Sequence, residues 1–416
     1  MAREDFISAY FSYVGDTEAP ATFHRWSCLS ILGAYLGRSY RFHLGHFKVF
    51  PNIYCMLMGD AGTRKSTAIK IASGLLRKSG YTAIAAERTT KEKFLLDLAG
   101  DTGDSETVSS EKFLESRLFG ANSGEPAELF VAADEFNTFV GNGNIEFLSM
   151  LGVLWDYDGT FSNRVKNSKS IEIQDPTVSI LAGNTPTGFS LAFPIEAIGQ
   201  GIFSRLVLVY GEKTGKKITF PEAPDPAATA NIISLLQAIK AVAIGAAEIT
   251  AEAKKVLDKI YKSWTGVDDV RFDSYSNRRF THLLKLCLII SASALKNTID
   301  LSDVIYANTI LTHAEHTMPK ALGEFGKSKN SDVAHKLLHI LESADGIVSR
   351  KVLWKQVHND LESMTALGDI LNNLLLADKI LSTPGGYLAK RKILEETGND
   401  LIDFSLLTEE ERKYVS

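Results

Sequence analysis

The stretch that decides the fold is MLMGDAGTRKST, residues 56–67, which joins an apolar run to a pattern typical of a helix. Glycines let a backbone turn closely around an anion, and the amide groups that open the next helix point toward it. We therefore expect a phosphate-binding loop, in which Lys65 meets the β and γ phosphates of ATP and the Ser66 hydroxyl binds Mg²⁺. The expected nucleotide-binding residues are Gly59, Asp60, Ala61, Gly62, Thr63, Arg64, Lys65, Ser66 and Thr67.

One position departs from the usual loop pattern, because Arg64 and not glycine precedes the lysine. Taken alone, the segment could therefore be an ordinary glycine-rich turn. A second motif favours the nucleotide site, because the apolar run 129–133 leads directly into Asp134 and Glu135. Buried parallel strands place such acids at the carboxyl edge of a sheet, beside a phosphate loop.

The two acids have different expected roles. Asp134 suits Mg²⁺, since a hard cation prefers carboxylate oxygen, and Glu135 suits general-base work on the attacking water. An isolated Asp-Glu pair more often lies in a solvated loop. Two motifs in the correct order on two expected strand ends make a coincidence improbable, and together they predict ATP hydrolysis.

Two further polar residues stand at the ends of expected strands. Asn184 follows the apolar run 178–182 and could orient a water or the γ phosphate, although alone it would be a turn residue. Arg205 stands immediately before the apolar run 206–210. It is either a surface cation at a strand start or a finger that stabilises charge on the nucleotide of a neighbouring subunit.

Short apolar runs that alternate with helical segments predict an α/β fold with a parallel sheet covered on both faces. The expected strands are 53–58, 82–86, 129–133, 178–182 and 206–210. A Pro-rich joint at 221–226 precedes an almost purely helical region, and a later order of three helices and two strands is typical of a winged helix. The expected divisions are an N-terminal helical collar (1–50), the ATPase core (51–224), a helical lid (225–325), the winged helix (331–393) and an acidic tail (394–416).

The composition is that of an ordinary globular protein of 416 residues, with 45% hydrophobic and 23% charged residues. A net charge of −5 excludes a broadly basic surface, so contact with nucleic acid would need a few concentrated cations. The apolar stretch 283–295 is interrupted by Lys285 and too short to span a bilayer, so we expect no membrane partner. Cys28, Cys55 and Cys287 lack metal-ligand spacing, which favours reduced thiols and a cytoplasmic location.

Together these motifs resemble those of the minichromosome-maintenance type of AAA+ replicative helicase and of the related phage and plasmid helicases, where the glycine before the lysine is also replaced. Residues 134–136 are similar to the Walker B ending of that family, 181–186 to its sensor 1 segment and 204–206 to its arginine finger. Segment 278–286 looks like the sensor 2 helix, with Arg278 at the sensor position and Arg279 as the near alternative. Read without the family, Arg278 would be a solvated cation in the first turn of a helix. Ala61 stands where the family usually has proline.

The resemblance also assigns a role to segment 161–173, two short alternating runs around a polar turn. In the family, a hairpin at this location projects into a central channel and carries cations to DNA. The resemblance thus implies that Lys166 and Lys169, together with Arg164, contact the DNA backbone without reading its sequence. Without the family, an exposed charged hairpin with no ligand is equally reasonable.

The function implied by the resemblance is an ATP-driven, Mg²⁺-dependent DNA helicase that forms a ring, expected to be a hexamer, and acts on single-stranded or forked DNA. The N-terminal oligonucleotide-binding module and zinc-binding cysteines of the cellular members are missing, which suggests a compact version from a phage or mobile element. The alternative is a helicase loader or initiator ATPase that remodels a partner on DNA. A non-enzymatic DNA-binding adaptor is disfavoured by the nucleotide site. The winged helix could contact phosphate or dock a replication protein. Such a protein could also bind the tail, although residues 401–407 could instead cap the core of their own chain.

Overall fold

The computed structural model describes residues 5–100, 127–163, 171–194, 201–323, 325, 329–344, 346–361, 363–376, 379–389 and 401–415. The chain divides into two compact units. The larger unit comprises Met1–Gly323 and Asn399–Ser416, and the smaller one comprises Glu324–Gly398.

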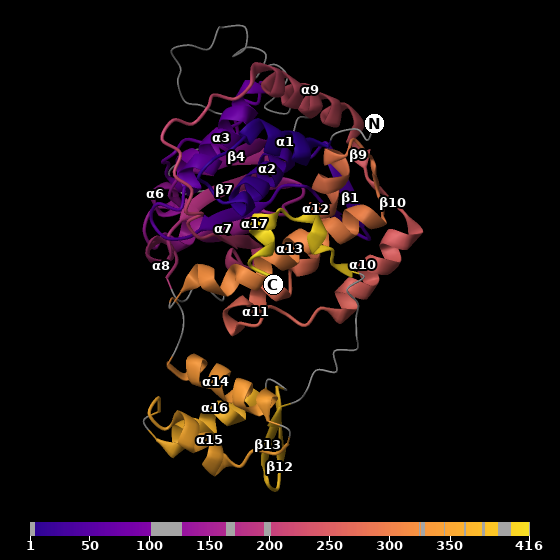
Figure 1. The fold of residues 1–416 in the computed structure, drawn as a ribbon. Helices are drawn as coiled ribbons and strands as arrows, with labels where there is room; N and C mark the ends of the chain where they lie inside the picture. The colour runs from indigo at the N-terminus through magenta and orange to yellow at the C-terminus, as the bar shows by residue number, and fades with distance from the viewer. Residues whose placement is uncertain are drawn as a thin grey trace. The chain divides into compact units, whose positions relative to one another are not determined.

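A parallel sheet forms the centre of the larger unit (Figure 1). Its strands lie in the order β4-β7-β3-β8, so the expected mixed α/β fold is confirmed and is compatible with a P-loop or Rossmann-like core. Every neighbouring pair is parallel, with Met58 of β3 opposite both Asn184 of β7 and Tyr210 of β8. The strands are β3 (Tyr54–Met58), β4 (Glu128–Ala133), β7 (Thr177–Asn184) and β8 (Leu206–Tyr210).

The expected strand at 82–86 does not form. In its place, Ile84 makes a single parallel bridge to Phe130 of β4, flanked by two backbone hydrogen bonds of 2.8 and 2.9 Å. No residue of this segment is buried. An edge segment that buries so little apolar surface gains little from extending its pairing, which explains why the prediction was wrong here.

Helix α2 (Ala21–Leu36) lies within the core of the larger unit. It is buried from Thr22 to Leu36, because it contacts β3, β7 and β8 on one side and other helices elsewhere. A helix that is buried all round explains why its sequence shows no polar stripe. Helices α1 and α2, which fall within the expected N-terminal helical collar (1–50), therefore pack into the larger unit. The contacting helices are α1 (Phe6–Val14), α3 (Lys65–Lys78), α9 (Pro226–Val242) and α12 (Arg279–Ser293).

The helices expected after the Pro-rich joint form and belong to the same compact unit as the sheet. Asp225 caps α9 and Pro226 occupies its first turn, where a missing amide proton costs nothing. A short parallel pairing of β9 with β1 joins this region to the rest of the unit, β10 pairs with β11 within the region, and α13 contacts β8. The elements are α10 (Ala251–Ser263), α11 (Asp273–Ser276), α13 (Leu301–Leu322), β1 (Tyr40–Leu44), β2 (Phe47–Val49), β9 (Gly245–Ala246), β10 (Glu248–Ile249) and β11 (Thr298–Ile299).

The C-terminal segment returns to the larger unit. Glu411 of α17 (Glu409–Arg412) forms a buried ion pair with Arg25 of α2, with Nε and Oε1 2.6 Å apart. Leu401 and Leu407 are also buried. Residues 401–407 thus cover the core of their own unit, which is one of the two alternatives that the sequence left open.

The smaller unit has the expected order of three helices followed by an antiparallel hairpin. Its core contains Leu337, Leu353, Leu371 and Ile380. A side chain at Gly386 would approach the Val348 carbonyl oxygen to 2.2 Å, so only glycine lets the hairpin pack this closely. The elements are α14 (Lys329–Ser343), α15 (Arg350–Val357), α16 (Met364–Leu376), β12 (Ile380–Thr383) and β13 (Gly386–Ala389).

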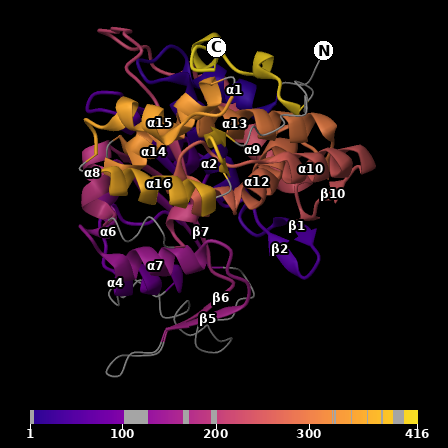
Figure 2. The ribbon, with the colours of Figure 1, turned by 90° about the horizontal axis from the view of Figure 1, so that it is seen from below.

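An antiparallel hairpin formed by β5 (Thr160–Asn163) and β6 (Ile171–Gln174) lies beside α4 (Lys91–Leu98) (Figure 2). The predicted DNA-contacting residues Arg164, Lys166 and Lys169 fall between its strands, outside the described residues. No helix among the described residues combines the length and apolar character needed to cross a membrane. The three cysteines are buried and unpaired.

Candidate active site

The predicted phosphate loop connects the end of β3 to the start of α3, with Lys65 as the first helical residue. A side chain at Gly59 would meet the Gly211 carbonyl oxygen at 2.5 Å, so the loop needs glycine there. Arg64 has a φ of 64°, in the left-handed region that glycine adopts at least cost. The arginine thus takes up a backbone conformation that favours glycine, and its guanidinium Nε donates to Glu18 at 2.7 Å.

The Lys65 ammonium group is folded into this loop. Its Nζ donates to the carbonyl oxygens of Gly59 and Asp60 at 2.7 and 2.9 Å, and to the Thr63 hydroxyl at 3.1 Å. Burial lowers the pKa of Lys65, and the charges of Asp60 and Glu135 oppose this effect. Phosphate oxygens would be stronger, charge-assisted partners than these neutral acceptors. The loop therefore holds a cation that a triphosphate could draw outward.

The two predicted motifs meet across β7. At Gly183 an added side chain would lie 2.6 Å from the Asp134 carbonyl oxygen and 3.4 Å from Cβ of Lys65. The absence of a side chain at Gly183 therefore lets the β4 end and the start of α3 approach each other. Lys70, one helical turn after Ser66, forms an ion pair with Asp134, with Nζ and Oδ2 2.9 Å apart. Glu135 is exposed and accepts from the Thr138 hydroxyl at 3.5 Å.

Asn184 ends β7 at the same edge. Its side chain is 2% exposed, and its Oδ1 accepts from the Thr185 amide at 3.0 Å. Its Nδ2 is buried and has no hydrogen-bond partner among the described residues. A buried unpaired donor costs about 1–3 kcal/mol. Such a group fits a site where a ligand oxygen or an ordered water supplies the missing acceptor.

The donors at this edge fit a magnesium–nucleotide complex. Ser66 and Asp134 offer a hydroxyl and a carboxylate, both hard oxygen ligands. Mg²⁺ commonly binds through one or two protein oxygens and takes its remaining ligands from water and phosphate. No cluster of three or more His, Cys, Asp or Glu side chains suited to a metal occurs within the described ranges.

Arg205 lies at the opposite end of the sheet. It immediately precedes β8, whose first residue Leu206 pairs with Tyr54 at the start of β3, whereas the phosphate loop follows the end of β3. A five-residue strand spans about 16 Å, which is farther than an arginine side chain extends. Arg205 therefore cannot reach the predicted phosphate loop of its own chain.

Arg205, Asp156 and Arg278 form a cluster at this amino end, which we call the Asp156 cluster. Asp156 lies 3.7 Å from Nη2 of Arg205 and 3.5 Å from Nη1 of Arg278. Burial and the nearby charge of Arg278 lower the pKa of Arg205, and its buried Nε has no hydrogen-bond partner within the described part of the chain. One half-exposed acid thus faces two guanidinium groups.

The structure separates the roles of Arg278 and Arg279. The Arg279 side chain is 3% exposed and donates from Nε to both carboxylate oxygens of Glu315, at 2.8 and 2.9 Å. It also stacks over the Trp264 ring at 4.0 Å. The Arg278 side chain is 36% exposed. Arg279 is therefore committed to the core, and Arg278 is the one of the two that can reach outward.

Buried groups from α12 support the Asp156 cluster. His282 Nε2 donates to the Ser204 carbonyl oxygen at 3.0 Å, directly before Arg205. Lys285 donates to Asn52 Oδ1 at 2.7 Å and lies 4.3 Å from the centre of the Trp155 ring. Burial lowers the pKa of His282 to about 3 and that of Lys285 to about 7. Neutral His282 therefore anchors the backbone at the start of β8.

Sequence reasoning missed three residues with contacts to these sites: Lys70, Thr138 and Asp156. Lys70 carries a signal, because it lies four residues after Ser66 and so shares its helix face. Asp156 carries none, because an acid after a helix is ordinary. No protein-family model and no curated protein sequence matches this chain.

Proposed function

We propose that this protein is an ATP hydrolase of the AAA+ type that forms a ring, translocates on single-stranded or forked DNA and unwinds the duplex. One observation carries the proposal: the predicted nucleotide-binding groups lie at the carboxyl end of the parallel sheet, while Arg205 and Arg278 lie together at its amino end. Neither end alone holds all the groups that hydrolysis needs. In a ring, the amino end of one subunit would face the phosphate loop of the next.

Within one subunit, Lys65 would bind the β and γ phosphates while Ser66 and Asp134 hold Mg²⁺. The metal would supply charge neutralisation on the phosphate oxygens. Glu135 would accept a proton from the attacking water. The unpaired Nδ2 of Asn184 would orient this water or the γ phosphate. Each of these roles uses a group placed at the same sheet edge.

The neighbouring subunit would complete the site with Arg205 and Arg278. Two guanidinium groups beside the γ phosphate would stabilise the negative charge that develops during transfer. Asp156 now faces both groups at 3.5–3.7 Å, so the nucleotide would compete with this acid for them.

The remaining parts have proposed roles as well. Helices α9 to α13 would serve as the AAA+ lid, and the smaller unit, with its three helices and hairpin, would serve as a winged helix. Arg164, Lys166 and Lys169 would carry the β5–β6 hairpin's contacts to the DNA backbone. Cations repeated around a ring would allow DNA binding by a chain of net charge −5.

A strand-separation assay on forked and tailed duplexes, run alongside DNA-stimulated ATPase, tests this function. We expect the wild-type chain to hydrolyse ATP and separate strands, and we expect Lys65→Ala and Glu135→Gln to abolish both activities in folded protein. Lys259→Ala, at an exposed position of α10, is the matched control and should behave as wild type. Hydrolysis without strand separation would favour a loader or initiator ATPase. Full turnover by Lys65→Ala or Glu135→Gln would reject the assigned site.

A further inference from the structure

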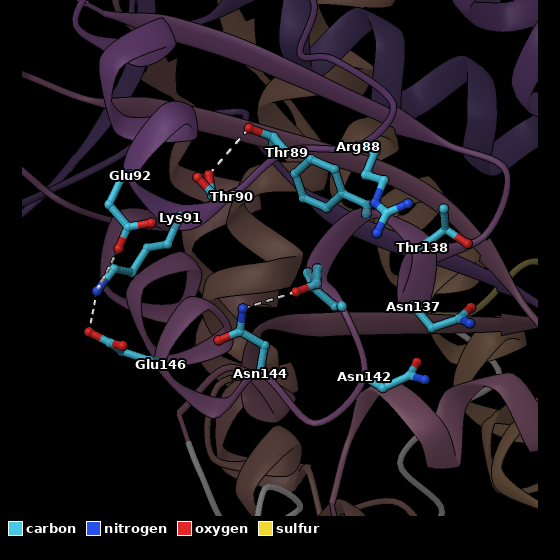
Figure 3. A pocket seen from close by; sticks show the side chains of 13 residues that line it. Arg88, Thr89, Thr90, Lys91, Glu92, Asn137, Thr138, Asn142, Asn144 and Glu146 are labelled. Atoms are coloured by element: carbon cyan, nitrogen blue, oxygen red, sulfur yellow. Dashed lines mark hydrogen bonds and ion pairs between the residues drawn. The ribbon is translucent and has the colours of Figure 1, made fainter.

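A polar pocket of about 560 Å³ is lined in part by α6 (Phe136–Val140), the helix that directly follows Glu135 (Figure 3). One wall is segment 88–90 with the first turn of α4, and the other is α6 (Phe136–Val140) with the loop leading to α7 (Ile145–Leu154). In the view of Figure 3, Arg88 of the first wall appears on the same side as Asn137, Thr138 and Asn142 of the second. Its volume lies within the range of about 300–1,000 Å³ that small-molecule sites occupy.

The lining is rich in amides and hydroxyls. Asn137, Asn142 and Asn144 all contribute, and the Oδ1 atom of Asn137 is buried with no hydrogen-bond partner in the described part of the chain. Asparagine amides donate and accept in the geometry of nucleobase edges. An unpaired amide oxygen in such a wall fits a ligand that brings its own donor.

The formal charges of the side chains that line the pocket cancel, because two cations face two acids. Lys91 forms ion pairs with Glu146 and Glu92, whereas Arg88 has no ion-pair partner among the described residues. One unpaired guanidinium can bind one phosphate group, but the neutral balance does not suit a highly charged ligand. The lining therefore fits a base with a single phosphate better than a triphosphate.

The pocket lies close to the hairpin that is proposed to contact DNA. Helix α4, which forms one wall, contacts β6 of the hairpin proposed to hold the strand. Figure 2 shows α4, α7 and the two hairpin strands on the same side of the larger unit. A strand held along the hairpin would therefore lie close to α4, the helix whose first turn lines this pocket.

The pocket also touches the catalytic machinery. Thr138 lines it, and the Thr138 hydroxyl donates to Oε2 of Glu135 at 3.5 Å, the long limit of a hydrogen bond. A contact this long is easily shortened or broken by a small movement of the wall. Occupation of the pocket can therefore change how Glu135 is held.

We propose that this pocket binds one nucleotide of a single DNA strand, with its base against the asparagine amides and its phosphate at Arg88. Thr138 is then a positioning residue that transmits occupancy of the pocket to Glu135. The inference rests on the proposed function, because it assumes that the strand runs along the hairpin and that Glu135 activates the attacking water.

Binding of an abasic strand tests the base site. The full chain, with a non-hydrolysable ATP analogue, is titrated with a fluorescent oligonucleotide of mixed sequence and with the same strand carrying abasic sites, which keep every phosphate. We expect the wild type to bind the abasic strand roughly tenfold more weakly, as one amide–base pair would give. Asn137→Ala and Asn142→Ala should lose this preference, while Asn231→Ala, at an exposed position of α9, should keep it.

The outcomes separate this inference from the proposed function. If the wild type binds both strands equally, or if the pocket variants keep the preference, the base site is overturned while DNA-stimulated hydrolysis can stand. If the wild type binds neither strand and hydrolyses no ATP, the proposed function fails and the pocket proposal fails with it.

Substitution of Thr138 tests the coupling. We expect Thr138→Val to reduce the stimulation of kcat by DNA several-fold, with little change in the KM for ATP. Thr138→Ser, which keeps the hydroxyl, should restore the stimulation. Full stimulation in Thr138→Val, or equal losses in both variants, would overturn the positioning role.

Discussion

The two ends of the parallel sheet differ in what they lack. The carboxyl end holds the predicted phosphate loop, two acids and the unpaired amide of Asn184, but Arg205 lies a strand length away from it. The amino end holds Arg205 and Arg278, yet it offers them a single acid as partner. Under the proposed function, the two ends would be complementary halves of one hydrolysis site, and a second subunit would bring them together.

The two halves also differ in how their charges are held. Lys65 donates hydrogen bonds to neutral oxygens, and a charged phosphate oxygen would accept stronger ones in their place. The two arginines of the Asp156 cluster are held by a formal negative charge, which a phosphate must outcompete. Nucleotide affinity should therefore depend mainly on the groups at the carboxyl end of the sheet. Turnover should depend on contact with the arginines at the amino end of a neighbouring subunit.

Complementation between two inactive variants gives the largest expected effect. Lys65→Ala and Arg205→Ala should each lower turnover at least about 100-fold, the typical cost of removing a group that stabilises transition-state charge. Mixed rings should regain activity, because an Arg205→Ala subunit can offer an intact loop to the intact arginine of a Lys65→Ala subunit. Phosphate release across mixing ratios measures this recovery.

A matched pair serves as the control for complementation. Lys65→Ala mixed with Glu135→Gln should not recover, since both changes damage the same end and every loop in the ring stays defective. Recovered activity in this control would contradict the assignment of the two groups to different ends of the sheet. The same holds if Lys65→Ala and Arg205→Ala recover no activity at any mixing ratio.

The neighbours Arg278 and Arg279 give the next largest effect. Arg279→Ala leaves Glu315 buried without its counter-charge, which should destabilise the fold by about 3–5 kcal/mol. Arg278→Ala should leave the melting temperature unchanged and lower turnover about tenfold. Thermal unfolding and ATPase assays on the same preparations separate the two. The assignment of Arg278 to the subunit-facing end would be wrong if only Arg279→Ala changed turnover in folded protein.

Most of the fold could be predicted from the sequence, because each strand and the loop after β3 is marked by a pattern of neighbouring residues. Apolar runs marked β3, β4, β7 and β8, while glycines marked the loop between β3 and α3. The strand prediction for 82–86 was wrong because the segment lies at the sheet edge and buries little. Its sequence resembles a strand, but pairing there would add too little stability.

The sequence could not predict contacts between distant segments. Arg278 and Arg279 are adjacent and chemically identical, so only the position of Glu315 on α13 separates them. Asp156 becomes notable only when β8 and α12 bring two arginines to it. The ion pair of Arg25 with Glu411 likewise joins opposite ends of the chain, and it holds the segment that contains residues 401–407 against the larger unit.

Removal of the Asp156 charge gives the smallest expected effect and sharpens the comparison most directly. Because Asp156 is 39% exposed, its ion pairs are screened and weak, and a change of only about two- to fivefold is expected. Asp156→Asn keeps the side-chain shape but frees Arg205 and Arg278 for the neighbour's nucleotide. The KM for ATP should therefore fall in assembled rings, while ATP affinity should stay constant in dilute, dissociated subunits.

Asp158 provides the matched control for this change, because it lies two residues away but pairs with Arg38 and Lys48, at 2.6 and 3.1 Å. Asp158→Asn should leave the KM unchanged. A rise in KM for Asp156→Asn would mean that the acid aligns the arginines for the nucleotide instead of competing with it. An equal improvement in ATP binding by dilute, dissociated subunits would mean that the effect arises within one chain. Because Arg205 cannot reach the loop of its own chain, this result would contradict the shared site.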